Sequence, residues 1–126
     1  MLRSRNEGWC GVRIHVTPDE RTIHVFGCRS MWVLNADLTI RKQIKTEVRS
    51  ASVDEFGYSP DGKLFAVLDY GRMQIFESFT GKLLGSIKTP PLLNGLIKFS
   101  SDGSYIAAQS FDETVGIYGI PRTTVP

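Results

Sequence analysis

The chain has 126 residues, 41% of them hydrophobic and 22% charged, which is typical of a globular protein and argues against a disordered one. Its length allows one domain or part of one, and its net charge of +2 is too small to indicate binding to nucleic acid or to an anionic membrane. No apolar run approaches the roughly 18–20 residues of a membrane helix, and residues 1–11 lack the apolar core of a signal peptide.

The first group of predicted strands lies between residues 12 and 44. Val12, Ile14 and Val16 alternate with two polar residues, and this period of two is typical of a half-buried strand. A turn at residues 17–20 follows it. Further strands are predicted at residues 23–26, 31–34 and 40–44.

The clearest pattern lies between residues 56 and 87, which read as four short strands. The turn at residues 59–62 has the sequence SPDG, in which Pro fixes φ, Asp can bond its own backbone and Gly tolerates a positive φ. After it, strands are predicted at residues 64–68, 73–76 and 83–87. Four strands joined by tight turns form one antiparallel meander.

A third group of strands begins near Leu96. Strands are predicted at residues 96–99, 105–108 and 114–118, with a turn of sequence SSDG at residues 100–103. Beyond Gly119 the chain contains Pro121 and Pro126, and proline is poorly suited to a paired strand. This group is therefore expected to lack a fourth strand.

The three groups repeat at a regular spacing. Asp19, Asp61 and Asp102 mark equivalent turns 42 and 41 residues apart. A period of about 40–45 residues with four strands per unit is typical of propeller blades, and no helical period of 3.6 is present. The apolar strand at 64–68 fits this reading, because both faces of a blade are covered by neighbouring blades.

The middle copy resembles a WD-repeat blade. The resemblance is carried by residues 58–66 (YSPDGKLFA), 73–77 (MQIFE) and 80–82 (TGK), and residues 99–103 with 115–118 resemble the next blade. Where the family often ends the third strand with Trp-Asp, this chain has Leu-Asn, Phe-Glu and Tyr-Gly, and no Gly-His dipeptide precedes any copy. The family's buried Asp–His–Ser–Trp network is therefore not expected, and a related lineage of bacterial-type propellers fits equally.

The resemblance implies an all-β fold, a partial β-propeller domain of about three four-stranded antiparallel blades. The expected blades are residues 12–50, 51–91 and 92–120, the last without its outer strand. A propeller closes with roughly four to eight blades. We therefore expect the chain to be part of a larger propeller, or to complete a ring with other copies or another subunit, and residues 1–11 can supply the missing strand.

No group of residues indicates catalysis. Ser59 lies in a near match to the G-x-S-x-G elbow, but Asp61 replaces the second glycine and no helix follows. His15 and His24 are expected on neighbouring strands, at the surface or half-buried, without a third metal ligand. The acidic pairs at 19–20, 54–55 and 112–113 are expected to be solvated. We expect no metal and no cofactor.

Binding residues are predicted in two places. Arg41, Lys42, Lys45 and Arg49 form a basic stretch, interpreted either as a charged outer strand or as a contact for a phosphate or an acidic peptide. The turns between second and third strands place aromatic residues beside charges, as binding surfaces do, although plain turns remain an alternative. The predicted partner-binding residues are Asp69, Tyr70, Arg72, Phe111, Asp112, Glu113, Lys45 and Arg49.

These observations predict a non-catalytic scaffold for protein–protein interaction. Its two cysteines, Cys10 and Cys28, are too few for a disulfide scaffold, and we expect both to be reduced in a cytoplasmic protein. The alternative is a fragment or subunit of a propeller enzyme, lactonase-like or dehydrogenase-like, with its active site outside this chain. Aromatic residues at equivalent strand positions are expected in the core: Trp32, Phe65, Phe76, Tyr105 and Tyr118.

Overall fold

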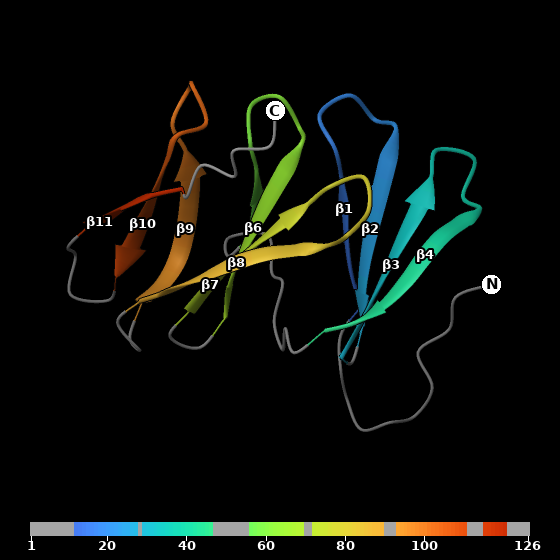
Figure 1. Cartoon of the computed structure of the whole chain (residues 1–126), viewed down its shortest axis with the longest axis horizontal. Helices are drawn as coiled ribbons and strands as arrows, with labels where there is room; N and C mark the ends of the chain where they lie inside the picture. Colours follow the sequence, from blue (N-terminus) through green and yellow to red (C-terminus); the bar gives the residue numbers. More distant parts are fainter. Residues whose placement is uncertain are drawn as a thin grey trace.

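The computed structural model describes residues 12–27, 29–46, 56–69, 72–89, 93–110 and 115–120. These ranges form strands and turns only, which confirms the predicted all-β class, and none of them contains a helix with the length and apolar character needed to cross a bilayer. Three antiparallel sheets follow one another along the chain (Figure 1).

The strands of each sheet pair in chain order. The first sheet contains β1 (Arg13–Val16), β2 (Thr22–Gly27), β3 (Ser30–Asn35) and β4 (Ile40–Lys45). The second sheet contains β5 (Phe56–Tyr58), β6 (Leu64–Asp69), β7 (Arg72–Glu77) and β8 (Leu83–Lys88). The third sheet contains β9 (Leu93–Phe99), β10 (Tyr105–Ser110) and β11 (Val115–Gly119).

The predicted strands are confirmed, with ends that differ by a few residues. Within the described ranges the third sheet has three strands. The predicted role of residues 1–11 as an additional strand, and the predicted reduced state of Cys10 and Cys28, concern residues outside these ranges.

The first turn of each sheet is built by the same hydrogen bonds. In the second sheet the Ser59 hydroxyl donates to Asp61 Oδ1 (2.7 Å), and the amides of Lys63 and Leu64 donate to Asp61 Oδ1 and Ser59 Oγ (both 3.0 Å). The turns beginning at Thr17 and Ser100 repeat every one of these bonds. The sequence spacing of the aspartates therefore corresponds to a repeated local structure.

The repeated turns also lie side by side, along the upper edge of the sheets in Figure 1. A methyl group on Gly62 would lie 3.3 Å from Pro18 Cδ, and one on Gly103 would lie 3.7 Å from Pro60 Cδ. The proline of each turn thus packs on the glycine of the next. This contact relates the first sheet to the second as it relates the second to the third.

Aromatic side chains fill the interface between the first and second sheets. Phe65 is fully buried at its centre and stacks on Phe56 and Phe76, with ring centroids 5.0 and 4.9 Å apart. Phe26 and Met31 of the first sheet pack against this cluster. Burial of each large apolar side chain contributes roughly 1.5–3 kcal/mol, so this cluster is a major source of stability.

Aliphatic side chains fill the interface between the second and third sheets. The buried members of this cluster are Ala66, Leu68, Met73, Ile75, Ile97, Ile106 and Ala108. They come from β6 and β7 on one side and from β9 and β10 on the other. Because successive residues of a strand face opposite sides, β6 and β7 supply both interfaces, which explains the fully apolar strand at 64–68.

The two outer faces of this row of sheets carry exposed apolar side chains. The structure shows β1 to be half-buried, as predicted, but the partly buried side chain is that of His15. Ile14 is 64% exposed, and Val12 and Val16 are also exposed. The expected core position is wrong for Tyr105, which is 54% exposed on the third sheet. The reason is the same at both ends, since no described sheet lies beyond these faces.

Candidate functional site: a basic groove between two sheets

The structure describes only part of the predicted partner-binding set. The side chains of Lys45 and Arg72 are described, while Asp69 is described as the last residue of β6 without its side chain. The other predicted residues lie outside the described ranges: Tyr70, Arg49, Phe111, Asp112 and Glu113.

Lys45 and Arg72 line one groove, although they are 27 positions apart and belong to different sheets. The groove has a volume of about 350 Å³ and lies between β4 of the first sheet and β7 and β8 of the second. Arg29 is a third basic lining residue, and none of the described lining residues is acidic. The other lining residues are Ile44, Thr46, Gln74, Phe76, Gly81, Leu83 and Ser86.

Arg29 was not predicted from the sequence. It lies between β2 and β3 with a φ of 57°, in the left-handed region, and its carbonyl oxygen accepts a hydrogen bond from the Thr46 amide (3.0 Å). This bond places the turn beside the end of β4, where Lys45 lies. A single arginine in a short turn carries no sequence signal, because only the β3–β4 pairing brings it to the groove.

Gln74 is the buried polar residue of the groove. It lies in the middle of β7, its side chain is 4% exposed, and its Nε2 donors have no hydrogen-bond partner within the described residues. A buried polar group without a partner costs roughly 1–3 kcal/mol. Native proteins contain few such groups, so this amide is an unusual feature of the groove.

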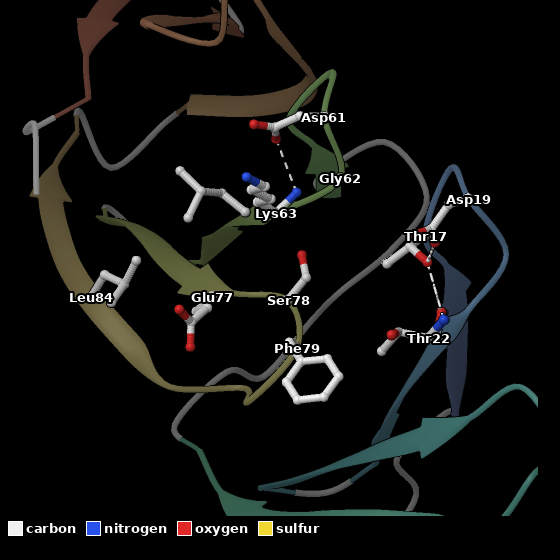
Figure 2. Close-up of a pocket in the computed structure, with 11 residues that line it drawn as sticks. Thr17, Asp19, Thr22, Asp61, Gly62, Lys63, Glu77, Ser78, Phe79 and Leu84 are labelled. Atoms are coloured by element: carbon white, nitrogen blue, oxygen red, sulfur yellow. Dashed lines mark hydrogen bonds between the residues drawn. The ribbon is translucent and has the colours of Figure 1, made fainter. Parts of the chain in front are cut away.

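A second pocket, of about 630 Å³, lies at the opposite ends of the same two sheets, beside the repeated turns (Figure 2). Asp19 and Asp61 line it, and hydrogen bonds in their turns lower the pKa of each: chiefly from the Thr17 hydroxyl to Asp19 and from the Lys63 amide to Asp61. These carboxylates therefore stay ionised as parts of the turns. The Ser78 hydroxyl in this pocket is buried, and no described residue forms a hydrogen bond with it.

Arg41 of the predicted basic stretch connects the two sheets. Between β3 and β4 the register shifts by one residue, and Arg41 is the additional residue. Its guanidinium lies 4.0 Å from the Phe79 ring centroid and donates to the Phe79 carbonyl (2.9 Å) and to Asn35 Oδ1 (2.8 Å). Arg41 is thus a structural contact, whereas Lys45 further along β4 lines the groove.

His24 forms a buried polar link between the sheets. Its Nε2 lies 2.7 Å from the Ser78 carbonyl and its Nδ1 lies 2.7 Å from the Tyr58 hydroxyl. A carbonyl oxygen only accepts, so Nε2 carries the proton and Nδ1 accepts from Tyr58. Burial lowers the pKa of His24 to about 4 and raises that of Tyr58. The imidazole is therefore neutral near pH 7.

The structure also explains the residues considered for catalysis. His15 and His24 are paired neighbours on β1 and β2, as predicted, but the expectation of a surface or half-buried residue is wrong for His24, which is fully buried. Ser59 is 3% exposed and its hydroxyl belongs to the turn. Within the described ranges, no three His, Cys, Asp or Glu side chains converge as metal ligands.

The sequence matches no protein-family model, and no curated protein is similar enough to count as a relative.

Proposed function

We propose that the chain is a set of three WD-like propeller blades that serves as a non-catalytic scaffold for protein–protein interaction in the cytoplasm. The repeated turns, the four-stranded meanders and the sheet-to-sheet packing support the propeller arrangement. In such an arrangement rigid sheets hold short turns and edge strands in fixed positions, which suits recognition of a partner.

The observation that carries this proposal is the basic groove. Lys45 and Arg72, which the sequence selected separately as partner-binding residues, line the same depression together with Arg29. The groove exists only because two neighbouring sheets pack against each other. A surface composed jointly by successive repeats is how repeat proteins form extended binding sites.

The exposed outer faces are part of the same proposal. Ile14 on the first sheet and Ile117 on the third are 64% and 63% exposed, so each end of the row offers an apolar face to a further sheet. That sheet belongs to a second copy or to the remainder of a larger propeller. Size-exclusion chromatography with light scattering tests homo-assembly: a stable, folded monomer would contradict it.

The scaffold function is tested by affinity purification of the full-length gene product, followed by mass spectrometry. We compare the wild-type protein with the double variant Arg29→Glu/Lys45→Glu and with Arg21→Glu, an exposed residue of the first turn that lines neither pocket. Partners that bind through the groove are retained by wild type and Arg21→Glu and lost by the double variant. Identical partner sets for all three proteins would reject this surface as the scaffold's binding site.

A further inference from the structure

The floor of the basic groove offers hydrogen-bond donors with no acceptor. Gln74 is only 4% exposed, and its Nε2 group lacks a partner within the described residues. Its neighbours across the sheet are Val67 on β6 and Ser86 on β8. An occupant that brings an oxygen atom to Gln74 would remove the penalty of this unsatisfied amide.

The rim of the groove favours a negatively charged oxygen. Arg29 and Lys45 are exposed at its edge, and Arg72 lines it as well. Hydrogen bonds in which one partner is ionised are roughly twice as strong as neutral ones. Arg29 and Lys45 beside an amide donor therefore favour an anion, since no acidic side chain among the described residues lines the groove.

The apolar walls of the groove favour a peptide over a simple inorganic ion. Ile44, Phe76 and Leu83 line it beside the charged residues, and Leu83 is 49% exposed. An inorganic ion makes no use of apolar walls, whereas a peptide with an acidic residue next to an aliphatic one fills both. The volume of about 350 Å³ lies at the lower end of the range for ligand pockets, enough for a short segment.

We infer that the groove between the first and second sheets binds an acidic peptide segment, with one Asp or Glu carboxylate accepting from Gln74 and held by Arg29 and Lys45, and an adjacent aliphatic side chain packed on Ile44 and Leu83. This inference rests on the proposed scaffold function and names the chemistry of its partner.

The proposal is tested by fluorescence anisotropy with purified protein and a fluorescein-labelled synthetic peptide in which glutamates alternate with leucines. A second peptide has glutamine at every glutamate position. Wild-type protein is expected to bind the glutamate peptide at least about tenfold more tightly, and binding should weaken when sodium chloride is raised, because salt screens exposed charges. Equal affinity for the two peptides would overturn the proposal.

Three variants locate the binding. Gln74→Leu removes the donor but keeps an apolar side chain of similar size, and we expect about a tenfold loss of affinity from a lost charge-assisted bond. Arg29→Glu/Lys45→Glu should abolish binding, and Arg21→Glu, which has half that charge change and lies elsewhere, should leave it within about twofold. Unchanged affinity in Gln74→Leu, or equal loss in Arg21→Glu, contradicts the assignment.

Two further measurements distinguish a peptide site from an inorganic-ion site and from misfolding of the variants. Inorganic phosphate is titrated against the bound peptide: displacement only at high concentration supports a peptide site, and displacement by stoichiometric phosphate identifies an ion site and overturns the proposal. Urea unfolding confirms that each variant is folded. If the peptide does not bind but the groove variants still lose cellular partners, the acidic-peptide chemistry fails while the scaffold function stands.

Discussion

The two sheet-to-sheet interfaces share the contact between the proline of one turn and the glycine of the next, but their side chains differ in chemistry. Between the first and second sheets lie stacked phenylalanines, the His24 link and the Arg41 contact. Between the second and third sheets lie aliphatic residues, including Ala66 and Ala108. The repeated turns fix how the sheets follow one another, and the side chains between them are free to differ. The polar contacts of His24 and Arg41, and both pockets described above, belong to the aromatic interface.

The largest expected difference comes from truncating the centre of each interface. Phe65→Ala should lower the free energy of unfolding by about 3–5 kcal/mol, because a fully buried ring between two stacked rings leaves a large cavity. Ile106→Ala, equally buried in the aliphatic interface, removes fewer atoms and should fall at the low end of about 2–5 kcal/mol. Urea unfolding of both variants measures this, and a larger loss for Ile106→Ala would contradict the ranking.

The second largest expected difference between the interfaces is in how their contribution to stability depends on pH. The pKa of His24 is lowered by burial from 6.5 to about 4, so between these values the unfolded chain binds more protons than the folded one. Stability contributed by neutral His24 is therefore complete above about pH 6.5 and is lost as the pH falls to about 4. At 1.36 kcal/mol per pKa unit the total is about 3 kcal/mol.

The control for this pH effect is His24→Gln, which does not titrate. The difference in stability between wild type and variant isolates the contribution of His24, because all other groups, His15 included, are present in both proteins. The turn aspartates lose their contribution at lower pH, since hydrogen bonds, first from the Ser104 hydroxyl, lower the pKa of Asp102 to about 2. Parallel stability curves for wild type and His24→Gln between pH 4 and 6.5 would show that His24 is not the sensor.

The contrast between the interfaces also shows what the sequence could predict. The turns are local, so Pro, Asp and Gly at residues 60–62 sufficed to predict them and the strands around them. The partners of His24 lie 34 and 54 residues away, and no local pattern marks them. The buried side of β1 was also unpredictable, because alternation defines two faces and only the neighbouring sheet decides which one is covered.

For the candidate site the limit was similar. Lys45 was found because it lies in a basic stretch, and Arg72 because it follows an aromatic turn. Arg29 and Gln74 were missed, since a single arginine or glutamine gives no pattern until two sheets place it beside others. The chemistry of the groove is thus a property of packing rather than of any one segment.

A smaller difference is expected where the turns meet. Gly62 and Gly103 have φ values of 73° and 76°, so replacing either by alanine should cost about 1 kcal/mol. Gly62→Ala should cost more, because its new methyl group lies 3.3 Å from Pro18, while the corresponding contact at Gly103 is an ordinary 3.7 Å. Thermal unfolding measures both. In a Pro18→Ala background the excess at Gly62 should disappear, and its persistence would place the strain elsewhere.

The smallest expected effect is a gain in stability in the first turn. Glu20 has a φ of 61° at the position that Gly62 and Gly103 occupy in the other turns, and its amide donates the same hydrogen bond, to Thr17 O (2.8 Å). A left-handed conformation costs a non-glycine residue roughly 1–2 kcal/mol, partly offset by the greater entropy of glycine in the unfolded chain. Glu20→Gly should therefore raise the free energy of unfolding by about 0.5–1 kcal/mol.

Two control variants separate this backbone effect from the loss of a charge. Glu20→Ala keeps the unfavourable φ and should give no gain, and Glu20→Gln keeps the side chain and removes only its charge. If all three variants stabilise equally, as measured by urea unfolding, the charge and not the backbone is responsible. The position tolerates a side chain because, within the described residues, no proline of a preceding turn packs on it, as Pro18 packs on Gly62. Only a sheet added beyond β1 would make glycine a steric requirement there as well.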